Sequence, residues 1–204
     1  MKLHWSPKSP YVRKVMIAIL ERGLDGQIEC VRSPVAITSP NSEVMRDNPL
    51  NKIPTLVRDN GDPLYDSMVI CAYLDVLGEG PRLIPDRFED RIETLRLHAL
   101  ANGLIDALIL WRNERDRPEQ ARSRPHLDAY AFKVDATLDH LEAIEVARLG
   151  GRPFDLGQIT LGTALGYADF RFAELGWRST RPSLTTWFEG FSSRPSAQAT
   201  APFE

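Results

Sequence analysis

The stretch KLHWSPKSPYVRKVMIAIL, residues 2–20, decides the fold of the first part of the chain. KLHW has the composition and length of a short strand, and a Ser-Pro pair follows it at Ser9-Pro10. Beyond that pair, apolar residues recur at helical spacing until Gly23 stops the run, namely Val12, Val15, Met16, Ile19 and Leu20. The stretch therefore predicts a strand, a short loop and a helix that starts near Pro10.

The sequence that follows extends this pattern. QIECV, residues 27–31, predicts a second strand, and a polar, Pro-interrupted connector covers residues 32–51. Residues 55–58 and 63–65 flank DNGD, a hairpin signal with Asn-Gly at its centre. A further helix is expected from Ser67 to Gly78. The order β, α, β, connector, β-hairpin, α is the thioredoxin-like topology.

The rest of the chain has helical periodicity only. Residues 78–86 are rich in Gly and Pro and predict a linker, so we expect domains at 1–77 and 87–204. A helix is expected over about 90–111, and its apolar residues nearly encircle it, which favours burial against another helix or a second subunit. The fold class predicted is α+β followed by all-α.

Composition excludes several classes of protein. Lys and Arg total 25 and Asp and Glu total 28, so the net charge is −3, which argues against a nucleic-acid partner. The two cysteines, Cys30 and Cys71, form no C-x-x-C pair, and the four histidines lack metal-ligand spacing. No segment approaches the roughly 20 apolar residues of a membrane span, and no signal-peptide pattern is present. We expect a soluble cytoplasmic protein without metal or cofactor.

Ser9 has two interpretations. As a helix N-cap it would accept a hydrogen bond from a backbone amide, and Pro at the next position is common there. Alternatively its hydroxyl, at a helix N-terminus that favours negative charge, would donate to a ligand thiolate. Ser9-Pro10-Tyr11-Val12 matches the C-P-Y-C frame of glutaredoxins without either sulfur, so dithiol exchange is excluded. Ser6, three residues earlier, is the competing hydroxyl.

Two further motifs each have a structural and a functional interpretation. Ile53-Pro54 precedes the predicted third strand, either as an ordinary strand entry or as a turn that offers backbone groups to a peptide-like ligand. Asp66-Ser67 opens the next helix, either as a cap or as a site for the α-amino and carboxylate groups of an amino acid.

Together, SPYVRKV, NKIPTLV and YDSMVICAYL resemble the glutathione transferase family over essentially the whole chain. The resemblance implies a thioredoxin-like domain followed by a helical domain, a cis proline at Pro54, and a thiolate-stabilising role for Ser9. It also implies glutathione binding by Lys52, Ile53, Pro54, Asp66 and Ser67, and a homodimer. The residues implied for the electrophile pocket are Tyr11, Asn102, Trp111 and Arg112.

The family's central helix usually opens with a capping box. In RPFDLGQITLGTALGYADF we expect Thr160 at the N-cap and Thr163 at the third helical position, where the family has Asp.

The function expected is activation of the glutathione thiol for attack on a small hydrophobic electrophile, with glutathione as cosubstrate. Glutathione-dependent isomerisation or dehalogenation, and a non-catalytic glutathione-binding or protein-interaction role on the same fold, are the alternatives.

Overall fold

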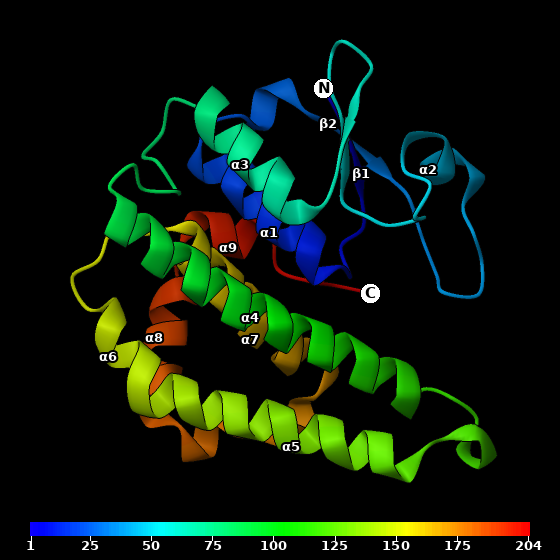
Figure 1. Cartoon of the computed structure of the whole chain (residues 1–204), viewed down its shortest axis with the longest axis vertical. Coiled ribbons are helices and arrows are strands. Elements are labelled where there is room, and N and C mark those ends of the chain that lie inside the picture. Colours follow the sequence, from blue (N-terminus) through cyan, green and yellow to red (C-terminus); the bar gives the residue numbers. More distant parts are fainter. The chain divides into compact units, whose positions relative to one another are not determined.

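Figure 1 shows the computed structural model of the protein, which describes all of residues 1–204. Residues 1–94 and 195–204 form one unit, and residues 95–194 form the other. The first unit contains the sheet, and the second is helical. The predicted fold, a thioredoxin-like domain followed by an all-helical domain, is confirmed.

The sheet of the first unit has four short strands in the order β2-β1-β3-β4. β1 pairs parallel with β2, while β1 with β3 and β3 with β4 are antiparallel. Leu3 and Leu56, partners across β1 and β3, are fully buried and lie in the core. The strands are β1 (Lys2–Trp5), β2 (Glu29–Arg32), β3 (Thr55–Val57) and β4 (Pro63–Leu64).

Three helices and a 3-10 turn complete the contiguous part of this unit: α1 (Pro10–Glu21), η1 (Asp25–Gln27), α2 (Ser42–Asp47) and α3 (Ser67–Leu77). α1 and α3 pack against each other, as Figure 1 shows in blue and blue-green. The hairpin turn between β3 and β4 places Gly61 at φ 90°, the left-handed region that favours glycine. The predicted strand, helix and hairpin order therefore holds, with ends that differ by one or two residues.

The segment between α3 and the next helix, α4 (Phe88–Arg115), covers residues 78–87 and contains no helix or strand. It is fixed by Asp75, which is 1% exposed. The Asp75 carboxylate accepts from the amides of Leu83 (2.6 Å) and Ile84 (3.2 Å) and from Arg82 Nε (2.8 Å). A buried guanidinium, that of Arg22, lies 3.6 Å from the same carboxylate. The predicted boundaries at 77 and 86 stay a prediction.

Residues 195–204 belong to the first unit although they follow the second in sequence. Their helix, α9 (Pro195–Ala199), packs on α1, where Arg13 donates to the Ala197 carbonyl at 3.1 Å. Phe203 lies beside Trp5, with ring centroids 6.5 Å apart. This segment therefore covers part of α1 and the end of β1.

The helical unit contains most of α4, and α5, α6, α7 and α8. α4 runs from Phe88 to Arg115, longer at both ends than the helix predicted over about 90–111. The other elements are η2 (Glu119–Ala121), α5 (Arg124–His140), the π-helical turn η3 (Leu141–Glu145), α6 (Val146–Leu149), α7 (Leu156–Arg171), η4 (Ala173–Leu175), η5 (Trp177–Thr180) and α8 (Pro182–Ser192). No helix has the length and apolar character needed to cross a membrane.

The expected capping box of the central helix is wrong. α7 starts at Leu156, and its N-cap is Asp155, whose carboxylate accepts from the Gln158 amide at 2.9 Å. Thr160 and Thr163 are interior helical residues; the Thr160 hydroxyl donates to the Leu156 carbonyl at 2.7 Å. A carboxylate binds the free amides of a helix N-terminus more strongly than a hydroxyl because it also interacts with the helix dipole.

Candidate active site

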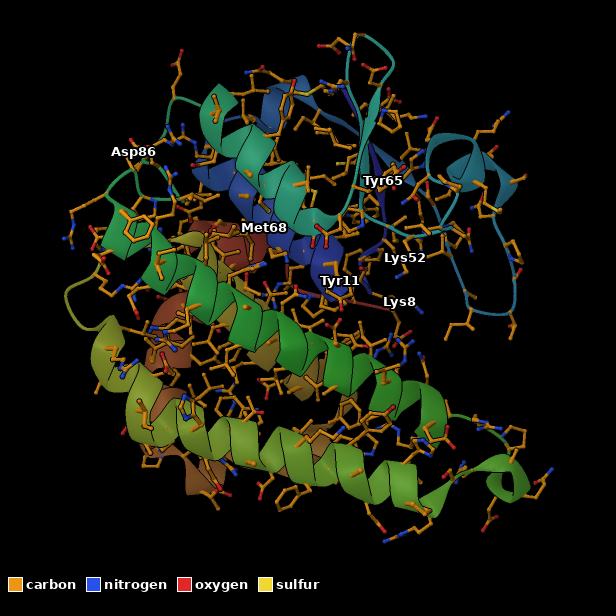
Figure 2. All side chains as sticks on the ribbon, in the orientation of Figure 1. Lys8, Tyr11, Lys52, Tyr65, Met68 and Asp86 are labelled. Carbon is orange, nitrogen blue, oxygen red and sulfur yellow. The ribbon has the colours of Figure 1, made fainter.

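The strand register brings the three predicted motifs to one edge of the sheet. His4 is paired with Thr55, so Trp5, where β1 ends, lies beside the residue that precedes β3, Pro54. Leu56 is paired with Leu64, so Tyr65, where β4 ends, reaches the same edge. Figure 2 shows Lys8, Tyr11, Lys52 and Tyr65 around it. The Ser9 loop, the Ile53-Pro54 turn and the start of α3 are therefore neighbours.

Ser9 is the N-cap of α1. Its Oγ accepts from the Val12 amide at 3.3 Å, and Pro10 is the first helical residue. The capping interpretation is thus confirmed. It uses a lone pair of the hydroxyl oxygen, and the hydroxyl proton has no acceptor within the chain, so the same group can still donate one hydrogen bond. Ser6 differs, because its Oγ lies 3.4 Å from the Lys8 amide, outside the helix.

The Ile53-Pro54 peptide bond is cis, as the family resemblance implies. Pro54 is buried and Ile53 is half-buried. Neither the amide nor the carbonyl of Ile53 has a hydrogen-bond partner within the chain. One backbone donor and one backbone acceptor are therefore available at this edge to an extended peptide.

The start of α3 supplies a carboxylate and a hydroxyl. Asp66 is the N-cap, with Oδ1 accepting from the amides of Met68 (2.9 Å) and Val69 (3.5 Å). Ser67 is the first helical residue and is 3% exposed, and its hydroxyl makes no hydrogen bond within the chain. The Tyr65-Asp66 peptide bond is also cis. Asp66 remains exposed, so it can cap α3 and still meet a cation.

The four basic residues near these motifs in sequence have different surroundings. Lys8 forms an ion pair with Glu204, while Arg13 and Lys14 are buried in α1. Lys52 has an exposed side chain outside any ion pair. Lys52 is therefore the cation of this group best placed to meet an anionic ligand.

Neither cysteine supplies a reactive thiolate here. Cys71 is buried in α3, and burial raises the pKa of its thiol to about 12, so it stays protonated at neutral pH. Cys30 is on strand β2, and burial also raises the pKa of its thiol. A reaction of a thiolate at this edge of the sheet therefore requires a thiol that a ligand supplies.

The residues predicted for the electrophile pocket belong to different units. Tyr11 is in the first unit, and Asn102, Trp111 and Arg112 lie on the part of α4 in the second. Trp111 packs against Phe172 with ring centroids 4.7 Å apart and the rings tilted by 31°, and Arg112 donates to the Tyr167 hydroxyl at 3.0 Å. Both side chains pack within the helical unit, and their role in a pocket stays a prediction.

A hydrogen-bond network that the sequence did not indicate connects β1 to α2. The ring of His4 lies between Ser33 Oγ (Nδ1, 2.7 Å) and Asp47 Oδ2 (Nε2, 2.7 Å). The three residue types are those of a hydrolase triad, but the Ser33 hydroxyl donates to the Val31 carbonyl at 3.0 Å, and both His4 and Ser33 are 2% exposed. Hydrogen bonds from His4 and Lys2 hold the pKa of Asp47 below its usual range. We assign this network a structural role, because the only hydroxyl in it, that of Ser33, is buried.

Comparison with known proteins identifies the family. The glutathione S-transferase N-terminal domain model matches residues 8–77, and the C-terminal domain model matches residues 124–190. The uncharacterized GST-like protein YibF of Escherichia coli is 34% identical over 206 residues, with 99% of this chain and 98% of that protein covered.

Two solved structures resemble the whole chain. A glutathione transferase family member from Pseudomonas fluorescens, with bound glutathione, is 41% identical, with a TM-score of 0.96 and coverage of 100% of this chain and 99% of that one. A glutathione S-transferase from Methylobacillus flagellatus, also with glutathione bound, is 32% identical, with a TM-score of 0.91 and 99% of each chain covered. The chain belongs to the glutathione S-transferase family.

Proposed function

We propose that the protein is a glutathione transferase that activates the glutathione thiol for attack on a small hydrophobic electrophile. One observation carries the proposal. The strand register brings three groups to one edge of the sheet. They are the Ser9 hydroxyl, whose proton has no acceptor in the chain, the unpaired amide and carbonyl of Ile53, and the Asp66-Ser67 pair that begins α3. These groups match, in turn, the thiol, the peptide backbone and the γ-glutamyl end of glutathione. Solved structures of two relatives contain bound glutathione.

In this proposal Ser9 acts on the thiol. A free thiol has a pKa near 8.5, so only about 3% of it is thiolate at pH 7. Lowering that pKa by about two units requires about 2.7 kcal/mol of preferential thiolate binding. A hydrogen bond from the Ser9 hydroxyl and the positive end of the α1 dipole supply interactions of this size.

The rest of the ligand is assigned by chemistry. Asp66 and Ser67 would hold the γ-glutamyl group, Ile53 would pair with the cysteinyl backbone beside Pro54, and Lys52 would meet a carboxylate. Tyr11, Asn102, Trp111 and Arg112 remain our assignment for the electrophile side. We further propose a cytoplasmic location, supported by the two unpaired cysteines, and no cofactor besides glutathione as cosubstrate.

Calorimetry with glutathione, followed by a panel of electrophiles assayed with glutathione, tests this function. Binding with turnover of at least one electrophile supports a transferase. Binding without turnover across conjugation, isomerisation and dehalogenation substrates would support a binding protein instead. Failure of glutathione to bind would contradict both.

Replacing Ser67 by alanine is expected to raise the glutathione dissociation constant about tenfold, because a hydrogen bond to a charged group contributes about 1.5 to 3 kcal/mol. Ser42→Ala is the matched control. Ser42 is also the first residue of a helix, α2, but it is exposed and is preceded by an Asn N-cap. Equal affinities of the two variants in calorimetry would remove Ser67 from the site.

We also propose a homodimer. α3 and the first turns of α4 expose five large apolar side chains, Val69 (46%), Val76 (69%), Leu77 (45%), Phe88 (69%) and Ile92 (43%). Exposed apolar side chains on neighbouring segments of the chain favour a protein interface. Sedimentation at micromolar concentration is expected to give twice the 23.0 kDa mass of the chain. A species of single-chain mass would contradict the dimer.

A further inference from the structure

Asn48 and Thr55 form a buried polar network beneath the Ile53-Pro54 turn. Asn48 is 1% exposed and Thr55 is fully buried. The Asn48 amide nitrogen donates to the Lys52 carbonyl (3.2 Å) and to Thr55 Oγ1 (3.0 Å), and the Thr55 hydroxyl donates to the same Lys52 carbonyl (2.8 Å). Two side chains that no sequence motif indicated therefore converge on one backbone oxygen.

These contacts determine where the next residue points. The Lys52 carbonyl is held inward by two donors, one from each side of the turn. The following residue, Ile53, has an amide and a carbonyl without partners in the chain, at the sheet edge. The Lys52 carbonyl and the Ile53 N–H belong to one planar trans peptide group, so fixing the carbonyl also fixes the Ile53 N–H, which points the opposite way.

Further hydrogen bonds hold Asn48 and the residues around it in place. Asn48 Oδ1 accepts from the Leu50 amide at 3.0 Å, so the Asn48 side chain spans the turn. Asn51 has φ 53°, in the left-handed region that Asn tolerates, and its side-chain oxygen accepts from the Asn41 amide at 2.9 Å. Asp47, next to Asn48, is bound by His4 and Lys2 of β1. The turn is thus anchored to the sheet as well as to α2.

We propose that Asn48 and Thr55 are positioning residues for glutathione, which hold the Ile53 backbone in the geometry that binds the cysteinyl unit before the ligand arrives. The inference rests on the proposed function of this edge. Neither residue contacts the ligand. They hold the turn in one conformation before binding. The free energy of glutathione binding is therefore not reduced by the entropy that a flexible turn would lose.

The test uses isosteric replacement of Thr55 and two ligands. Thr55→Val keeps the shape and removes the hydroxyl, whereas Thr55→Ser keeps the hydroxyl. S-methylglutathione has the backbone of glutathione but no ionisable thiol, so it separates backbone binding from thiolate stabilisation. Thr160→Val is the matched control, since Thr160 is also fully buried with its hydroxyl bonded to a backbone carbonyl, but it lies in the helical unit.

We expect Thr55→Val to raise the dissociation constants of glutathione and S-methylglutathione by the same factor, about tenfold, as calorimetry measures. The pKa of the bound glutathione thiol, read from thiolate absorbance, should stay at the wild-type value. Thr55→Ser should restore affinity to within about twofold, and Thr160→Val should bind as the wild type does. Wild-type affinity in a folded Thr55→Val variant would overturn the inference. If the wild type does not bind glutathione, the proposed function is overturned instead.

A measurement on the wild type keeps the inference testable if Thr55→Val does not fold. Backbone amide NMR relaxation of the ligand-free protein should give residues 51–53 order parameters near the rigid value of about 0.85. A turn that is mobile without glutathione and becomes ordered only with it would show that the network does not position Ile53 in advance.

Discussion

Replacing Ser9 by alanine is expected to raise the pKa of bound glutathione by about one to two units and to lower turnover at neutral pH about 10- to 100-fold. The hydroxyl proton favours the charged thiolate, so its loss leaves less thiolate below the new pKa. Activity should recover as the pH rises through that value. A pH-rate profile measures the shift directly, and loss of the helix cap should separately lower the free energy of unfolding by about 1 kcal/mol.

Two variants show whether the effect belongs to the hydroxyl of Ser9. Ser6→Ala should leave the profile in place, because Ser6 lies before the helix and its Oγ faces the Lys8 amide. Ser9→Cys restores a sulfur at the glutaredoxin-like position and should favour a mixed disulfide with glutathione over conjugation. If Ser9→Ala keeps the wild-type profile while Ser6→Ala shifts it, the thiolate donor is Ser6.

Replacing Asp75 by alanine is expected to lower the free energy of unfolding of the first unit by about 3 to 5 kcal/mol. The substitution leaves the amides of Leu83 and Ile84 without their acceptor and removes the carboxylate nearest the buried Arg22 guanidinium. A buried charge that loses its partner keeps the full cost of its desolvation. The denaturant midpoint, followed by circular dichroism, is the measurement.

Asp62→Ala is the control for a carboxylate in an exposed pair. Asp62 bonds Arg58 at 3.0 Å on the surface, where such pairs contribute about 1 kcal/mol or less. Asp75→Asn keeps the shape and removes the charge, and it should fall between the two. A midpoint for Asp75→Ala equal to that of Asp62→Ala would mean that the carboxylate does not hold residues 78–87 in place.

Local periodicity was sufficient to predict the order of elements in the first unit and the helical character of the rest. Helix starts were predicted well where a capping residue stands directly before an apolar run, as at Ser9 and Asp66. The predicted start of α7 was wrong, because Thr160 and Thr163 have the spacing of a capping box but lie beyond the true N-cap, Asp155. The charge of Asp155 at the free amides decides the true start.

The residues that support the site could not be predicted in this way. His4 and Asp47 are 43 positions apart, and their contact exists only once β1 and α2 are packed. Asn48 and Thr55 are nearer in sequence, but an Asn before Pro49 is equally typical of an exposed turn. Burial is what distinguishes the two cases, and burial depends on the whole unit.

The packing of residues 195–204 on α1 has a consequence for synthesis on the ribosome. Residues 1–94 emerge first, but the segment that supplies the Ala197 acceptor for Arg13 follows only after the whole helical unit has been translated. At about 5 to 20 residues per second, the nascent first unit waits for about 5 to 20 seconds with that face of α1 uncovered. During this interval the face is accessible to chaperones, and the first unit completes its fold only after the helical unit has been translated.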